Sequence, residues 1–215
     1  MKRITFFLAV ATAFLSAPFH VFAQDQAPAP EYHPGDLWVF KVTEKEMQAQ
    51  STAALGGDYV VIYSPEGKFI VRRPGGGMLE GRQDVGILIG LLYNPADEMQ
   101  FLQFPLVVGK KWKVNYQVQL RGSSNPTTRT ADNNVTGVEE VATPAGKFRA
   151  FKIDRYDTGG GGSYGTAPPR FLLTYGYSPE TRSVVKYHYE IQTPTGTSVG
   201  TRDIELIKFA SKRPN

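Results

Sequence analysis

A short turn sequence occurs twice in the chain, each time between two apolar runs. The copies are Pro65-Glu66-Gly67-Lys68-Phe69 and Pro144-Ala145-Gly146-Lys147-Phe148. Proline presets φ for the first corner of a tight turn and glycine tolerates positive φ, so each copy predicts a β-hairpin. A chain punctuated in this way is expected to be built from antiparallel strands.

Further landmarks recur in the same order around the two turns. They are Gly35 with Trp38 and Gly109 with Trp112 before the turns, and Tyr93-Asn94-Pro95 and Tyr177-Ser178-Pro179 after them. This order predicts two similar β-rich units in tandem, at residues 35–104 and 105–215. The expected fold is mainly β, with antiparallel strands in one continuous curved sheet, as in a half-barrel, or in two small sheets, as in a sandwich.

The start of the chain has the features of a secretory signal peptide. Lys2 and Arg3 supply a positive beginning, residues 4–15 are apolar, and Ala23 is a small residue at the expected cleavage site. No later apolar run approaches the roughly 20 residues of a membrane span. We therefore expect residues 1–23 to be removed and the mature chain to lie in the periplasm or outside the cell. Residues 24–34 are rich in proline and alanine and predict a flexible tether.

Cysteine content and charge exclude several classes of protein. The chain has no cysteine, which excludes disulfides, thiol catalysis and a lipid anchor at the cleavage site. It has 24 basic and 20 acidic residues, and two of the basic ones, Lys2 and Arg3, belong to the predicted leader. The mature chain is thus close to neutral, which argues against nucleic acid as a partner.

The residues that enzymes use are sparse. His33 and His188 are the histidines that remain after cleavage, too few for a zinc site. Glu139 and Glu140 are neighbours in an expected strand and point to opposite faces. The glycines of residues 159–162 lack the Lys-Ser/Thr that follows a phosphate loop, and no Gly-x-Ser-x-Gly elbow occurs. We expect no catalytic residue, metal or cofactor, although carboxylates brought together by folding would leave a hydrolase possible.

The second unit has the clearer strand pattern. From Trp112 to Leu120, apolar and polar residues alternate, which predicts a half-buried antiparallel strand. Further strands are predicted at residues 135–141, 147–157, 170–177, 182–192 and 202–209. Residues 121–134 are polar and predict a loop, and residues 43–54 fit either an extended strand or a short helix.

Two groups of residues are candidates for ligand binding. Residues 85–92 are the most apolar stretch of the mature chain and predict either a buried core element or the lip of a cavity. Tyrosines on two successive strands predict either a core wall or a groove for a lipid, glycan or peptide. The candidate ligand-binding residues are Ile87, Leu88, Ile89, Leu91, Tyr175, Tyr177, Tyr187 and Tyr189. On this hypothesis Ile89→Asp abolishes ligand uptake.

Residues 106–190 carry a further set of turn and strand motifs. They are Val108-Gly109-Lys110-Lys111-Trp112, Gly137-Val138-Glu139-Glu140-Val141, Ala150-Phe151-Lys152-Ile153, Tyr177-Ser178-Pro179-Glu180 and Val184-Val185-Lys186, together with the Pro144 turn. This part of the chain resembles uncharacterised exported bacterial β-rich domains of unknown function. It is more distantly similar to the half-barrel of periplasmic lipoprotein carriers. The resemblance implies a curved sheet whose concave face takes acyl chains, and it brings no catalytic residue.

These observations predict an exported envelope protein that acts as a binding module rather than as an enzyme. Its expected partner is an apolar or amphipathic, lipid-like ligand, or another envelope protein. A structural or assembly protein that pairs through a sheet edge is the alternative. An envelope-polymer hydrolase is the third hypothesis.

Overall fold

The computed structural model describes residues 25–45, 56–81, 100–118, 127–158 and 169–211. Every element of regular secondary structure in these ranges is a β-strand. They contain no helix long and apolar enough to cross a membrane. The predicted leader and the apolar stretch 85–92 lie outside the described residues.

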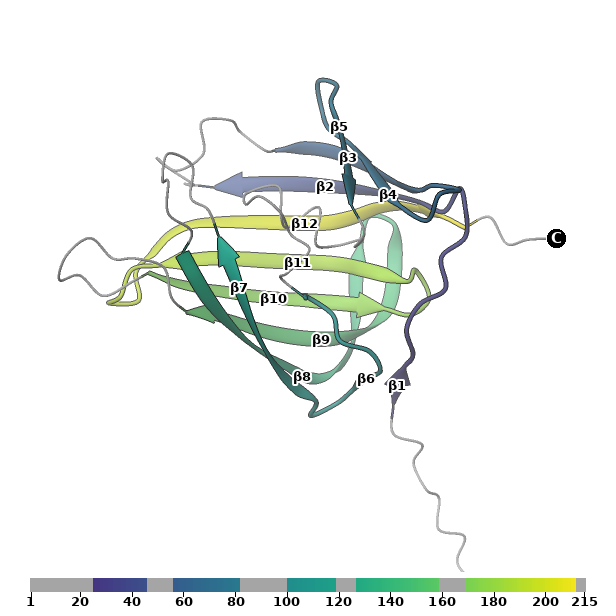
Figure 1. Ribbon diagram of the computed structural model, residues 1–215. Helices are drawn as coiled ribbons and strands as arrows, with labels where there is room; N and C mark the ends of the chain where they lie inside the picture. The colour runs from purple at the N-terminus through teal and green to yellow at the C-terminus, as the bar shows by residue number, and fades with distance from the viewer. Residues whose placement is uncertain (1–24, 46–55, 82–99, 119–126, 159–168, 212–215) are drawn as a thin grey trace, which may run out of the picture.

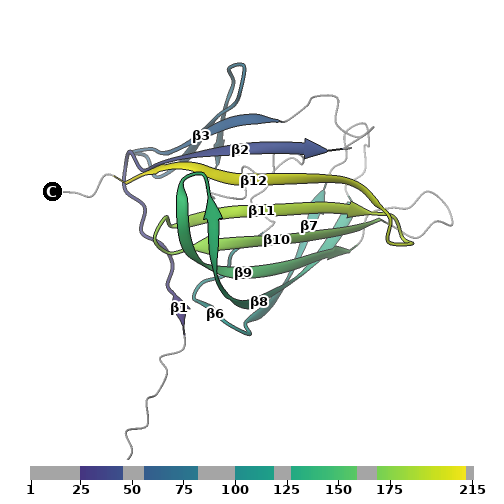
Figure 2. The ribbon, with the colours of Figure 1, turned by 180° about the vertical axis from the view of Figure 1, so that it is seen from behind.

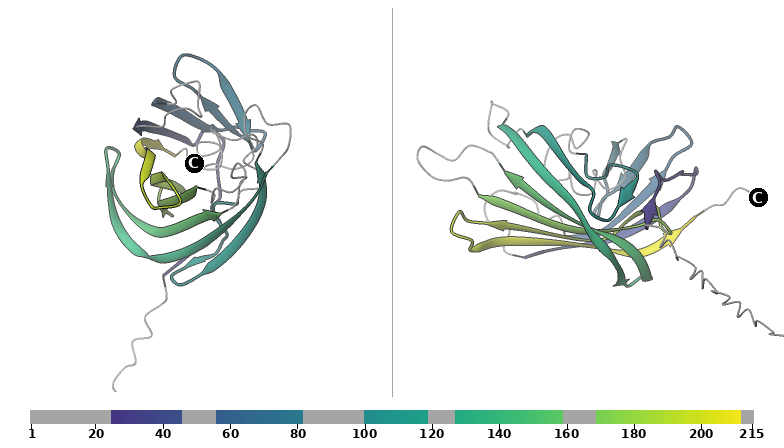
Figure 3. Two further views of the ribbon diagram at one scale, coloured as in Figure 1. Left: turned by 90° about the vertical axis from the view of Figure 1, so that its left-hand side faces the viewer. Right: turned by 90° about the horizontal axis from the view of Figure 1, so that it is seen from below.

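Ten strands form one antiparallel sheet with the spatial order β5-β4-β3-β2-β12-β11-β10-β9-β8-β7 (Figures 1 and 2). The strands are β2 (Leu37–Lys45), β3 (Gly57–Tyr63), β4 (Phe69–Arg72), β5 (Met78–Gly81), β7 (Lys111–Val118), β8 (Thr127–Thr143), β9 (Gly146–Thr158), β10 (Arg170–Ser178), β11 (Ser183–Gln192) and β12 (Ser198–Ala210). The sheet curves strongly (Figure 3), and its inner face carries the core. The mainly β fold with an antiparallel curved sheet is confirmed.

The strands of both expected units belong to this one sheet, because the last strand, β12, pairs with the first long strand, β2. Of the two arrangements left open by the sequence, one continuous curved sheet is therefore the observed one. The division into repeated units at residues 35–104 and 105–215 stays a prediction.

Both predicted hairpin turns are confirmed. In the β3–β4 turn, the Ser64 amide donates to the Lys68 carbonyl at 2.8 Å, and Gly67 has a φ of 75°. In the β8–β9 turn, Thr143 and Gly146 are cross-strand partners on either side of Pro144 and Ala145. These turns follow from local chemistry, which is why the sequence alone indicates them.

The long β8–β9 hairpin bends back toward the sheet. A β-bulge between Val135 and Gly137 shifts its register, and such bulges increase strand bending and twist. At its tip, the Ala145 amide donates to the Leu206 carbonyl of β12 at 3.2 Å. Nearby, a Cβ added to Gly176 of β10 would lie 3.3 Å from Ala150 Cβ, so the hairpin packs closely there.

The prediction of a flexible tether at residues 24–34 is wrong for the part that the structure describes, residues 25–34. Strand β1 (Gln26–Ala27) pairs with β6 (Leu106–Val107), and Ala27 is fully buried. Tyr32 packs its ring against Trp38, with the centroids 5.9 Å apart. The composition favoured an unpacked segment, but Ala27 lies in the core and the partly buried Tyr32 packs against it.

The loop predicted at residues 121–134 is wrong from residue 127 onward, where β8 begins. The side chains of Arg129 and Asn133 lie on the buried face of this strand. Because polar residues occupy positions where a core strand ordinarily carries apolar ones, the expected alternation is absent from the sequence. Residues 43–54 were expected to form either an extended strand or a short helix. Residues 43–45 form the end of strand β2, and residues 46–54 lie outside the described residues.

The other predicted strands are confirmed within the described residues. Trp112, Val114 and Tyr116 alternate inward along β7. The segments predicted between residues 135 and 209 fall within β8, β9, β10, β11 and β12.

Candidate functional site

The inner face of the sheet differs from one end of the strands to the other. One end, which we call the aromatic end, consists of Tyr32, Trp38, Tyr63, Phe69 and Phe209. Their rings contact one another at centroid distances between 4.9 Å and 6.0 Å. The Trp38 indole also donates to the Thr181 carbonyl at 2.8 Å. This end is an apolar core with its indole hydrogen bond satisfied.

The opposite end, which we call the charged end, consists of Glu44, Tyr116, Arg155, Asp157 and Arg202. These side chains are buried or nearly buried, and they come from β2, β7, β9 and β12. Buried charges require partners, because a charge removed from water without a partner costs several kcal/mol. The charged end meets this requirement with ion pairs.

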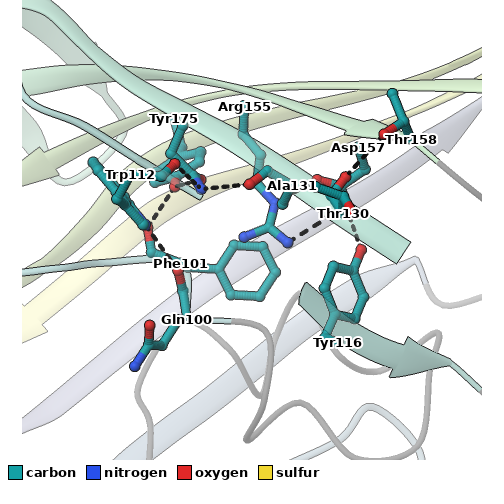
Figure 4. A network of polar contacts seen from close by, with 11 residues as sticks. Gln100, Phe101, Trp112, Tyr116, Thr130, Ala131, Arg155, Asp157, Thr158 and Tyr175 are labelled. Atoms are coloured by element: carbon teal, nitrogen blue, oxygen red, sulfur yellow. Dashed lines mark hydrogen bonds and ion pairs between the residues drawn. The ribbon is translucent and has the colours of Figure 1, made fainter. Parts of the chain in front are cut away.

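Arg155 and Asp157 form the first pair (Figure 4). They are two residues apart on β9 and therefore share the inner face, where Arg155 Nε donates to Asp157 Oδ1 at 2.7 Å. The Tyr116 hydroxyl donates to Asp157 Oδ2 at 2.5 Å. The Arg155 guanidinium lies 4.4 Å from the Phe101 ring centroid and 5.4 Å from that of Tyr116. The cation is thus enclosed by one carboxylate and two aromatic rings.

This environment shifts the pKa values of the groups in it. Burial, followed by the Asp157 charge, raises the pKa of Tyr116, so its hydroxyl stays protonated as a donor. Burial alone would lower the pKa of Arg155, but the Asp157 carboxylate, together with Tyr175 and Tyr116, outweighs burial and the pKa is raised. Both shifts favour the protonated forms of Tyr116 and Arg155, which are the forms that donate hydrogen bonds to Asp157.

Further hydrogen bonds cross the inner face beside the charged end. The Tyr175 hydroxyl donates to the Phe101 carbonyl at 2.5 Å and lies 3.4 Å from Asn133 Oδ1 (Figure 4). The Trp112 indole donates to the Gln100 carbonyl at 3.3 Å. Burial raises the pKa of Tyr175, with Arg155 acting against the shift. The segment that begins at Gln100 is held across the inner face by these bonds.

Arg202 and Glu44 form the second pair, between the partnered strands β12 and β2. Arg202 Nε donates to Glu44 Oε1 at 2.8 Å, and a guanidinium Nη2 contacts the same oxygen. Tyr59 of β3 lies near this pair, and burial raises its pKa while Arg73 and Arg202 act to lower it. On β8, the Arg129 guanidinium lies 4.0 Å from the Phe171 ring centroid.

The four predicted tyrosines all lie on the inner face and are buried, as a core wall requires. Tyr175 and Tyr187 are cross-strand partners, with ring centroids 6.2 Å apart. Tyr189 stacks on Tyr187, and Tyr177 packs edge-on against Phe104. Their role in ligand binding stays a prediction. Ile87, Leu88, Ile89 and Leu91 lie outside the described residues.

The sequence reasoning did not identify the charged end. Its signal was present as charged residues in phase with apolar ones: Arg155 and Asp157 follow Phe151 and Ile153 at alternate positions. Arg202 likewise precedes Ile204 and Leu206 on the same face of β12. A charge at such a position is predicted to face the core, and hence to have a buried partner.

The groups that the inner face offers are guanidinium groups, carboxylates, hydroxyls and aromatic rings. In the described ranges, no three His, Asp or Glu side chains cluster in a way that would hold a metal ion. Asp154 and Asp157 lie on opposite faces of β9, as the strand period requires, and His188 lies on the outer face next to Asp203. What the inner face can do chemically is combine apolar contact with charge-assisted hydrogen bonding.

No family model and no curated protein matches the chain. Similar solved structures include a predicted lipoprotein from Parabacteroides distasonis, with a TM-score of 0.52 and 13% identity over 87% of this chain and 100% of that one. The predicted lipoprotein YmcC of Escherichia coli has a TM-score of 0.45 and 10% identity, covering 85% of this chain and 87% of its own. A predicted exported protein of Bacteroides fragilis with a YmcC-like fold has a TM-score of 0.46 and 12% identity, covering 86% and 100%.

At these identities the likeness concerns the fold alone. The similarity to the Parabacteroides protein covers the whole length of that chain. The resemblance to lipoprotein carriers, drawn from motifs of the second unit, stays a prediction. The chain is similar in fold to the predicted lipoprotein from Parabacteroides distasonis.

Proposed function

We propose that the protein is an exported, non-enzymatic envelope protein that binds an amphipathic ligand along the inner face of its sheet. The observation that carries this proposal is a wall of aromatic rings that runs beside the charged end. Phe171 stacks on Tyr189 at 6.2 Å, Tyr189 on Tyr187 at 6.5 Å, and Tyr187 meets Tyr175 at 6.2 Å.

An amphipathic molecule matches this arrangement in both of its parts. Its apolar chain would contact the ring faces, where burial of apolar area stabilises the complex by about 25 cal/mol per Å². Its polar head would lie near Arg155 and Arg202, whose guanidinium groups are strong hydrogen-bond donors. A purely apolar ligand would leave the charged end unused, so we favour an amphipathic one.

Export is supported by the sequence and by the fold. The positive, apolar and small-residue segments of residues 1–23 have the order of a signal peptide. The Parabacteroides protein of similar fold is a predicted lipoprotein, which supports export of this chain. The absence of cysteine from this chain indicates release rather than lipid anchoring after cleavage.

The test is native mass spectrometry of the mature protein taken from its own host's envelope fraction, followed by organic extraction. An added mass that solvent releases, in the range of a lipid, is the expected result. The variant Tyr187→Leu should lower the fraction carrying that mass, because it removes a ring from the wall. Its control is Lys186→Leu, the neighbouring residue, which is exposed on the opposite face of β11. A bare mass for the wild-type protein would refute the proposal.

Assembly through a sheet edge is the second candidate function, and the end strands of the sheet support it. Strand β7 pairs with β8 alone among the described strands, and β5 likewise pairs with β4 alone. A sheet edge carries backbone donors and acceptors that can pair with another chain. The same mass spectrum distinguishes the candidates, since a dimer or a second polypeptide without lipid would favour assembly.

A further inference from the structure

The outer face of the sheet has an open groove of about 790 Å³ across β7, β8, β9 and β10. It lies on the side of these strands that faces away from the aromatic wall. The outward-pointing residues that line it are Lys111, Lys113, Asp132, Asn134, Asp154, Tyr156, Leu172 and Thr174. Ligand sites commonly have volumes of about 300–1,000 Å³, so the groove is large enough for a small molecule.

The cross-strand register arranges these residues in two rows. Lys111 is opposite Asn134, Asn134 is opposite Asp154, and Asp154 is opposite Thr174. Residues directly opposite one another have Cβ atoms about 5 Å apart, so the row is a continuous line of polar groups.

The second row lies two residues further along the strands. Lys113 is opposite Asp132, Asp132 is opposite Tyr156, and Tyr156 is opposite Leu172. Tyr156 and Leu172 are both half-buried, and they form an apolar floor beside the polar row. The groove therefore offers one flat ring, one aliphatic side chain and a border of polar groups.

The charges in the groove cancel. The groove contains two lysines and two aspartates, and Lys113 Nζ lies 3.2 Å from Asp132 Oδ1. Asp154 Oδ1 accepts a hydrogen bond from the Thr174 hydroxyl at 2.9 Å. A site with balanced charge has no net attraction for an anion or a cation, and it favours a neutral ligand with many hydrogen-bonding groups.

We propose that this groove binds a short neutral oligosaccharide. A sugar ring presents a face of C–H groups that fits against the Tyr156 ring, whose face is negative and attracts positive edges. Its hydroxyl groups donate and accept at once, and so match the amide of Asn134, the carboxylate of Asp154 and the ammonium of Lys111. An acyl chain would bury these polar groups without partners, which costs free energy.

The inference is independent of the amphipathic ligand proposed for the inner face. The side chains on which this proposal rests point outward from β7 to β10, whereas the aromatic wall lies on the inner side of the same sheet. The inward-facing residues Trp112, Asn133, Arg155 and Leu173 also border the groove. Failure of either proposal leaves the other standing, because the two experiments use different ligands and different residues.

The experiment screens the mature protein against an array of short neutral oligosaccharides and measures the best ligand by titration calorimetry. Saturable binding is expected. Tyr156→Ala should weaken it about tenfold through loss of the ring face. Asn134→Ala should weaken it about threefold to tenfold through loss of hydrogen bonds. Tyr156→Phe, which keeps the ring, should bind nearly as well as the wild type.

Asn115→Ala is the matched control, since Asn115 is an exposed residue of β7 on the same outer face, outside the groove lining. Near-ultraviolet circular dichroism establishes that each variant is folded. The proposal is overturned if no array member binds, or if folded Tyr156→Ala binds as tightly as the control. Tighter binding of an anionic oligosaccharide would assign the groove to charge recognition, and release of reducing ends would make it a hydrolase; either result also overturns it.

Discussion

The two ends of the inner face stabilise the same sheet by different means. At the aromatic end, rings from the N-terminal segment, β2, β3, β4 and β12 pack together, and the exposed fraction of Trp38 is 1%. At the charged end, Arg155 and Asp157 are as deeply buried, but they are held by an ion pair and a tyrosine hydroxyl. Apolar packing gains free energy from every contact, whereas a buried ion pair must first offset its own desolvation.

The two ends therefore differ in how substitutions affect stability. Replacement of both members of an ion pair at the charged end by apolar residues removes a desolvation cost together with the pair. A polar substitution at the aromatic end would add such a cost and remove packing as well. A fold that needed stability alone would be expected to have aromatic residues at both ends, so the charged end is the better candidate for function.

The largest expected effect is that of Trp38→Ala at the aromatic end. Loss of the indole removes contacts to Tyr32, Phe69 and Phe209 and the hydrogen bond to the Thr181 carbonyl. Truncation of a buried tryptophan typically lowers the free energy of unfolding by about 3–5 kcal/mol. Urea denaturation, followed by circular dichroism, measures it. A loss below about 1 kcal/mol would contradict the role given to this end.

The second prediction concerns the pair at the charged end. Asp157→Asn leaves the buried Arg155 guanidinium without its carboxylate, and we expect a loss of about 3 kcal/mol. The double variant Arg155→Met/Asp157→Leu removes both charges, and it should recover most of that loss. Unfolding in urea compares the two variants with the wild type. If the double variant were less stable than the single one, the pair would be a net stabiliser and the contrast between the ends would disappear.

The third prediction uses the Tyr116 hydroxyl. Tyr116→Phe removes a hydrogen bond to a charged group and should lower the free energy of unfolding by about 1.5–3 kcal/mol near neutral pH. The raised pKa of Tyr116 also gives a pH dependence. The unfolded chain releases this proton near the ordinary pKa of about 10, while the folded protein retains it, so stability is complete below that pH and falls above it.

The measurement is the free energy of unfolding at a series of alkaline pH values, for the wild type and for Tyr116→Phe. The wild type should lose stability more steeply above pH of about 10, because the variant lacks the titrating group. Tyr175 contributes the same slope to both proteins and therefore cancels in the comparison. Parallel curves would show that Tyr116 is not held in its neutral form.

The sequence predicted the parts of this fold that depend on neighbours along the chain. The turns at Pro65 and Pro144 and the alternation from Trp112 onward are local patterns, and each gave the correct strand or hairpin. The pairing of β12 with β2 is not local. Arg202 and Glu44 are separated by 158 positions, and no local pattern in either segment indicates that the two strands pair.

The candidate site was harder to predict for a related reason. The tyrosines were identified because aromatic residues on alternate positions are a familiar sign of a buried face. Arg155 and Asp157 were missed because charged residues are ordinarily assigned to the solvent face. Their inward orientation depends on the ion pair and on the rings of Phe101 and Tyr116, which only the folded chain brings together.

The smallest effect is expected on the outer face, where the same sheet carries an exposed contact between a histidine and an aspartate. His188 Nδ1 lies 2.7 Å from Asp203 Oδ1, as close as Arg155 Nε is to Asp157, yet both side chains are well exposed to solvent. Solvent screening and side-chain entropy reduce such surface pairs to about 0–1 kcal/mol. His188→Gln should therefore change the free energy of unfolding by less than about 1 kcal/mol, measured in urea at low and at high salt. A loss as large as that of Asp157→Asn would show that contact distance, and not burial, determines how much a polar contact stabilises this sheet, and the contrast between the two ends of the inner face would then depend on packing alone.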